Sequence, residues 1–225
     1  QAEQVTIHLP HPAFRPTALA CSETDILLGE QYAIYTTHLE PMLTEEKSIH
    51  RFAPVLRAPE IPVPWRAFSK VSLGDRIFLL DSEGLVVYER GSASSLEWRR
   101  WHLGRSCGFQ LLSFTAVEGP LARTVCAFLG ESAAEWALYG VTSVGEVVSL
   151  CPSGDNLEPV HVILERQEAT EIRGISLDYD GNLWVVSLGE EAQLYRFSPD
   201  GGSRERWKLP AARHWTTGIC SLRNG

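Results

Sequence analysis

The stretch that decides the fold runs from Ile172 to Pro210 and reads IRGISLDYDGNLWVVSLGEEAQLYRFSPDGGSRERWKLP. Four runs in it have the length and apolar alternation of β-strands, at residues 172–178, 183–187, 193–197 and 204–210. Each run is separated from the next by Gly, Pro or Asp residues, and Gly181 supplies the positive φ that a tight turn needs. The stretch therefore predicts four short antiparallel strands joined by hairpins, the size of one propeller blade.

The same order of strands recurs upstream, most visibly in the last strand of each unit. These last strands begin near Gln4, Ser48, Glu97, Glu158 and Ser203, at intervals of 44, 49, 61 and 45 residues. A period of about 40–50 residues is typical of propeller blades. The long interval predicts an insertion in the third unit, where residues 109–117 and 124–129 both read as its first strand.

The repeat predicts an all-β fold, a β-propeller of four-stranded antiparallel blades that forms a single domain over residues 1–225. The expected blades are residues 13–54, 65–103, 108–165 and 170–210. The proline-rich residues 52–65 are expected to be a loop, because proline cannot donate to a strand ladder.

The two ends of the chain each supply one strand of a further blade. Residues 4–9 resemble a last strand, and residues 215–222 resemble a first strand. About four complete blades are therefore expected, plus the first and last strands of another. We expect this chain to hold an incomplete ring whose missing strands come from residues outside it, because open sheet edges invite aggregation. The two end strands are then too far apart to hydrogen-bond to each other.

The blade at residues 172–210, with Gly181-Asn182-Leu183-Trp184-Val185 and Leu194-Tyr195-Arg196-Phe197, resembles the NHL, virginiamycin-lyase-like and gluconolactonase-like propellers. The resemblance covers one blade well and the others by pattern alone. The Gly-His and Trp-Asp ends of WD repeats and the double glycine of kelch repeats are missing. Kinship with the gluconolactonase-like class implies an axial divalent cation held by acidic side chains, for which Glu60, Glu168 and Glu171 are the candidates.

Most acidic residues lie instead in hairpin turns, where an Asp side chain caps the local backbone. We therefore expect neither metal nor any other cofactor. The sequence also lacks the H-E-x-x-H, G-x-S-x-G, Walker and dinucleotide-binding patterns, so no catalytic chemistry has motif support.

The charge of the chain argues against binding to nucleic acid or to a membrane. The formal net charge is −8, whereas a binder of phosphate backbones needs a basic face. The local exception is Trp98-Arg99-Arg100-Trp101, which alternates as an exposed outer strand would. No apolar run approaches the length of about 20 residues that spans a bilayer.

The five cysteines are widely spaced and odd in number, and no two form a C-x-x-C pair. They are expected to be small buried residues of a reduced protein, which predicts an intracellular location, cytoplasmic or nuclear. The cysteines are Cys21, Cys107, Cys126, Cys151 and Cys220.

Seven tryptophans suggest where a partner binds. Trp136 and Trp184 fall on inner strands and are expected in the core between blades. Aromatic and Arg residues on outer strands are enriched at binding hot spots, so the predicted partner site is Trp98, Arg99, Arg100, Trp101 and Trp207. The leading hypothesis is a non-enzymatic propeller subunit that binds another protein, and the alternative is a metal-dependent propeller hydrolase or lyase.

Overall fold

The structure is a computed structural model, and its described part consists of strands, one helix and the connections between them. It describes residues 18–21, 25–30, 33–38, 53–57, 67–70, 76–82, 84–90, 96–104, 107–127, 134–166, 171–178, 180–189, 191–199 and 203–209.

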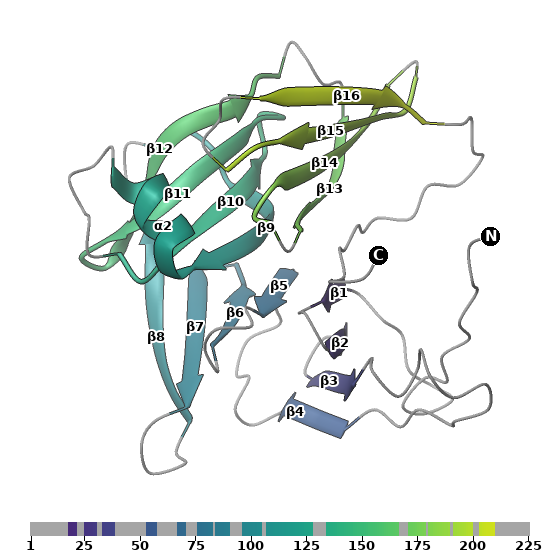
Figure 1. The fold of residues 1–225 in the computed structure, drawn as a ribbon. Helices are drawn as coiled ribbons and strands as arrows, with labels where there is room; N and C mark the ends of the chain where they lie inside the picture. The colour runs from purple at the N-terminus through teal and green to yellow at the C-terminus, as the bar shows by residue number, and fades with distance from the viewer. Residues whose placement is uncertain are drawn as a thin grey trace, which may run out of the picture.

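Sixteen described strands form four antiparallel meanders of four strands each, numbered blades 1 to 4 here (Figure 1). Blade 1 comprises β1 (Ala18–Cys21), β2 (Asp25–Glu30), β3 (Ala33–His38) and β4 (Ala53–Arg57). Blade 2 comprises β5 (Ala67–Lys70), β6 (Ile77–Leu80), β7 (Leu85–Arg90) and β8 (Leu96–Leu103). Blade 3 comprises β9 (Leu111–Glu118), β10 (Trp136–Thr142), β11 (Val147–Ser153) and β12 (Asn156–Leu164). Blade 4 comprises β13 (Glu171–Leu177), β14 (Leu183–Leu188), β15 (Gln193–Phe197) and β16 (Arg204–Lys208).

The first strands of successive blades lie next to one another, β1 by β5, β5 by β9 and β9 by β13. Neighbouring inner strands with four-stranded meanders running outward from them define a β-propeller. The predicted fold class is therefore confirmed. The strands expected at residues 4–9 and 215–222, and the expectation that they do not pair, lie outside the described residues.

Blades 2 and 3 are joined at their last strands as well as at their first. β8 and β12 pair in parallel, with His102 opposite Asn156 and Leu103 opposite Leu157. The result is one eight-stranded sheet that begins with β5 and ends with β9. Because β5 and β9 also contact each other, this sheet nearly closes on itself.

The core between blades 2 and 3 is built around Trp136 of β10. Its ring meets Phe78 of β6 at a centroid distance of 5.4 Å and Trp101 of β8 at 5.1 Å, both edge to face. All three side chains are buried. The expectation that Trp136 lies between blades is confirmed.

The core between blades 3 and 4 gathers the inward side chains of β14 and β15. Val185, Tyr195 and Phe197 pack there with Leu164 of β12 and Val147 of β11. Tyr195 is wholly buried, and its ring stacks on Phe197 at a centroid distance of 6.2 Å.

The predicted insertion lies between β9 and β10 and contains α2 (Gly119–Cys126). The expected strand at residues 124–129 is wrong, because residues 124–126 belong to this helix. Ala122, Val125 and Cys126 are its buried residues, which is the i, i+3, i+4 spacing of a helix face. Leu121 of α2 reaches blade 4, where a Cβ built on Gly181 lies 2.7 Å from its side chain.

The last strand of blade 1 also differs from the sequence reading. It spans Ala53–Arg57, whereas the period predicted residues 48–52 as the strand and 52–65 as a loop. Pro54 sits within it opposite Tyr35 of β3. Proline is found in edge strands such as β4, because only one side of an edge strand pairs with a neighbour.

The cysteines overturn the expectation of a reduced protein. Cys126, the last residue of α2, forms a disulfide with Cys151 of β11, and the two Cα atoms are 5.7 Å apart. Both cysteines are completely buried. The bond fixes the inserted helix onto the blade that carries it.

Candidate functional site

The structure divides the predicted partner site of blade 2 between the surface and the interior. Trp98 is 58% exposed and Arg99 is exposed beside it. Trp101 is buried against Trp136. This differs from the prediction, which placed the Trp101 side chain on the surface. Arg99 forms an ion pair with Asp155 in the β11–β12 turn.

Arg100 is committed to a contact within blade 2. Its guanidinium donates to both carboxylate oxygens of Asp81, at 2.8 and 2.7 Å. The Asp81 side chain is buried and also accepts a hydrogen bond from the backbone N–H of Gly84 at 3.0 Å. Arg100 therefore holds the β6–β7 turn against β8, a role that the sequence analysis missed.

Blade 4 presents two faces of different character. Alternation along its strands sends Val185, Tyr195 and Phe197 into the core with blade 3. The opposite face, called the blade 4 aromatic face here, carries side chains that are half-buried or exposed. Its members are cross-strand neighbours on β14, β15 and β16, namely Trp184, Val186, Leu194, Arg196 and Trp207.

The centre of this face is a stack of two tryptophans. The rings of Trp184 and Trp207 are nearly parallel, with centroids 5.5 Å apart, and the guanidinium of Arg196 lies 5.7 Å from the Trp184 ring. Trp207, the outer ring, is 40% exposed. The expected exposure of Trp207 is therefore found. Trp184 departs from the expectation that it is sealed in the core, because it forms the half-buried inner layer of this stack.

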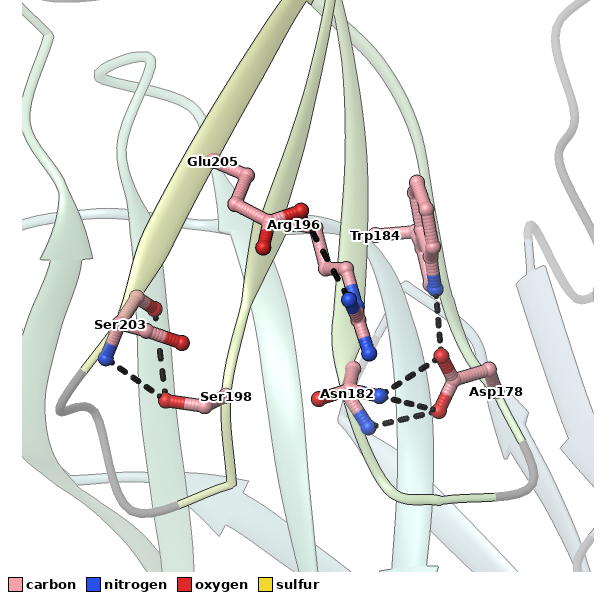
Figure 2. Close-up of polar contacts among 7 residues, drawn as sticks. All are labelled: Asp178, Asn182, Trp184, Arg196, Ser198, Ser203 and Glu205. Carbon is pink, nitrogen blue, oxygen red and sulfur yellow. Dashed lines mark hydrogen bonds and ion pairs between the residues drawn. The ribbon is translucent and has the colours of Figure 1, made fainter.

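The inner tryptophan is held by the carboxylate of Asp178, as Figure 2 shows. Asp178 accepts a hydrogen bond of 2.8 Å from the Trp184 indole N–H. It also accepts hydrogen bonds from the backbone N–H of Asn182 at 2.8 Å and from the Asn182 side-chain amide at 2.9 and 3.1 Å. The turn that carries Gly181 thus fixes the orientation of the stack.

The same contacts set the ionisation of Asp178. Burial by itself raises the pKa of the carboxyl, but hydrogen bonds from Trp184 and Asn182 and the charge of Arg196 outweigh it. The net result is a pKa below the ordinary value, because these partners favour the charged form.

A depressed pKa in the folded state means that the charged carboxylate stabilises the fold above the ordinary Asp pKa of about 4. That stability is lost as the pH falls through the lower, folded-state pKa. We expect Asp178→Asn to lower the free energy of unfolding by about 1–2 kcal/mol at pH 7, since three donor groups, the Trp184 indole and the backbone and side-chain amides of Asn182, lose an ionised acceptor.

Urea denaturation of the parent and of Asp178→Asn at pH 7 and pH 3 measures this effect. The difference between the two proteins should shrink at pH 3. Asp180→Asn is the matched control, because Asp180 is an exposed Asp of the same turn. A difference that is the same at both pH values would contradict the assigned role of Asp178.

Metal-ligating side chains do not gather in the part of the chain that the structure describes. Within those residues no group of three His, Cys, Asp or Glu side chains is placed to hold an ion. Of the three candidate axial ligands, Glu171 forms an ion pair with Arg173 at 2.7 Å, and Glu60 and Glu168 lie outside the described residues. The helix within the described residues is too short and too polar to cross a membrane.

Comparison with known proteins gives a likeness in structure alone. No family model and no curated protein matches the sequence. One similar solved structure is a protein of Bacteroides uniformis named as a candidate 6-phosphogluconolactonase, at 14% identity and a TM-score of 0.48, over 88% of this chain and 58% of that one. A streptogramin B lyase follows at 13% identity and a TM-score of 0.42, over 93% of this chain and 73% of that one.

A third similar structure is the N-terminal domain of Nup159, at 12% identity and a TM-score of 0.37, over 85% of this chain and 47% of that one. This chain spans a little over half the length of the first of these proteins. At these levels of similarity the assignment to the β-propeller class rests on the strand topology of the chain itself.

Proposed function

We propose that this protein is a non-enzymatic interaction module, a propeller subunit of a larger complex, that binds another protein through the blade 4 aromatic face and strand β16. The observation that carries the proposal is the half-exposed Trp184–Trp207 stack, with Arg196 beside it. Trp and Arg are enriched among the few residues that contribute most of the binding energy at protein interfaces.

The stack is organised before any partner arrives. The Asp178 carboxylate fixes the Trp184 ring, and the Trp207 ring stacks on the Trp184 ring. A rigid aromatic pair loses little conformational freedom when it is covered, so more of the contact energy is retained as affinity.

Alternation along β16 places Glu205 and Trp207 on the blade 4 aromatic face, opposite Arg196 and Leu194. Glu205 and Arg196 form an ion pair at 3.6 Å, so these two charges balance each other. The cations of β16 lie on the other face of the strand. We propose that the partner presents an apolar side chain that packs on Trp207, the exposed aromatic ring of the face.

Site-specific photo-crosslinking in cells that express the protein tests this proposal. A benzoylphenylalanine residue replaces Trp207 in one variant and Val162 of β12 in the control. Val162 is the matched position because its exposure of 41% equals the 40% of Trp207. We expect a discrete covalent adduct with one protein at position 207 and none at position 162.

Binding of the captured protein to purified parent and to Trp207→Ala then gives the size of the effect. A hot-spot residue contributes about 2 kcal/mol or more, so Trp207→Ala should weaken binding by about 30-fold. The proposal fails if position 207 yields no discrete adduct, or if Trp207→Ala binds as tightly as the parent. A stoichiometric divalent metal in the purified protein would instead support the propeller hydrolase or lyase alternative.

The disulfide changes the location that the sequence predicted, which was the cytoplasm or the nucleus. Disulfides rarely persist in the reducing cytosol. The Cys126–Cys151 bond therefore favours an oxidising compartment of the cell over the cytoplasm or nucleus. Fractionation of cells, followed by blotting for the endogenous protein, distinguishes these compartments.

A further inference from the structure

A pocket lies between blades 2 and 3, away from the blade 4 aromatic face. It is bounded by residues 81, 82 and 84 of the β6–β7 turn, the end of β8, the start of β9, and Leu157 of β12. Its volume of about 420 Å³ is in the range of small-molecule sites. Its described lining residues all belong to blades 2 and 3 or to the connection between them.

The lining separates into an apolar floor and a polar rim. Leu85, Leu111 and Leu157 form the floor and are almost completely buried. Ser82, His102 and Gln110 form the rim and are exposed. Each rim side chain is able both to donate and to accept a hydrogen bond. This lining suits a molecule that has an apolar body and a hydrogen-bonding group at one end.

The walls of the pocket are fixed by contacts that do not involve the rim side chains. The β6–β7 turn is held by the Asp81–Arg100 pair. The end of β8 is held by backbone bonds of 3.0 Å from His102 N–H to Asp155 and from Gly104 N–H to Leu157. The backbone N–H of Gln110 donates to the Ser143 hydroxyl at 2.9 Å. A pocket shaped in advance in this way spares a ligand the cost of ordering it.

The charge inside the pocket points to an uncharged ligand. Asp81, the acidic side chain among the described lining residues, is neutralised by two hydrogen bonds from Arg100. An ionic ligand would lose its hydration without gaining a counter-charge from the leucine floor. We propose that this pocket binds an uncharged small molecule with an apolar body and a hydroxyl or amide group directed at Ser82, His102 and Gln110.

Titration of two matched probes, followed by amide-resolved NMR, tests the proposal. Cyclohexanecarboxamide is uncharged, and cyclohexanecarboxylate has nearly the same shape with a negative charge. We expect the amide to shift resonances of residues 81–85, 102–104 and 110–111 with a Kd of about 1 mM, as befits so small a ligand. The carboxylate should bind at least about tenfold more weakly because its charge is not compensated.

Two variants of lining residues test whether the probe binds in the pocket, and a variant outside the pocket is the control. Ser82→Trp should fill the mouth and weaken binding of the amide by about tenfold or more, while Ser203→Trp, at an exposed serine of the β15–β16 turn, should leave it unchanged. Gln110→Leu keeps the backbone bond to Ser143 and should remove the preference for the amide. Shifts outside the pocket, equal binding of the two probes, or no loss in Ser82→Trp would overturn the proposal. None of these outcomes bears on partner binding at blade 4.

Discussion

Replacement of Trp136 by Ala is expected to destabilise the protein by about 3–5 kcal/mol, the range found when a large aromatic is removed from a packed core. The physical reason is its position between blades 2 and 3, where its ring contacts Phe78 and Trp101 edge to face. The variant would leave a cavity lined by both blades, which neither sheet can fill without moving. For a chain of this size we expect the Tm to fall by between about 6 and 20 °C.

Trp98→Ala is the matched control, because it makes the same substitution at a side chain that is 58% exposed. Thermal and urea denaturation of both variants should give a change of less than about 0.5 kcal/mol for Trp98→Ala. Equal losses for the two variants would show that the blades do not pack through Trp136.

The second large effect is expected from the disulfide. The bond between Cys126 and Cys151 closes a loop with a sequence separation of 25 residues. Constraint of such a loop in the unfolded chain is worth about 3 kcal/mol in the loop-entropy model. The double variant Cys126→Ala with Cys151→Ala should lose this amount, with added cost because both side chains are completely buried.

A reducing agent separates the bond from the packing around it. Dithiothreitol should lower the Tm of the parent more than that of the double variant, since the variant lacks the Cys126–Cys151 bond. Cys107→Ala is the control, because Cys107 lies at a half-buried position outside the bond. An unchanged Tm of the parent under reducing conditions, with free thiols shown by alkylation and mass spectrometry, would contradict the structure.

The strand pattern was predictable where alternation and turn residues agree. In blade 4 every strand lies within two residues of its expected bounds, because glycine marks each of the three connections between the strands. The prediction was wrong where the sequence of a segment was compatible with both a strand and a helix. Thr124 and Val125 are β-branched, which favours a strand, but the burial of Ala122, Val125 and Cys126 follows a helical period. The last strand of blade 1 was predicted at the wrong residues, because Pro54 was taken as a strand breaker although an edge strand accepts proline.

The candidate site was less predictable because it depends on contacts between distant residues. Alternation places Trp98 and Trp101 on opposite faces of β8, but it could not show which face is buried, since burial of Trp101 depends on Trp136 in another blade. The pairing of Arg100 with Asp81 and of Cys126 with Cys151 likewise joins separate segments. Trp207 was a candidate for an exposed position and is exposed, but its stacking on Trp184 follows from the register of β14, β15 and β16.

The central claim is that blade 4 buries one face against blade 3 and offers the other, through Trp207, to a partner. Hydroxyl-radical footprinting of the tryptophans, in the purified protein and in its native complex, tests both halves together. We predict that Trp207 and Trp98 are oxidised rapidly in the purified protein while Trp136 and Trp101 are protected, in line with their exposures. In the complex the oxidation of Trp207 should slow about tenfold or more, and that of Trp98 should not change. Oxidation of Trp207 at the same rate in both states, or protection of Trp207 already in the purified protein, would contradict the account.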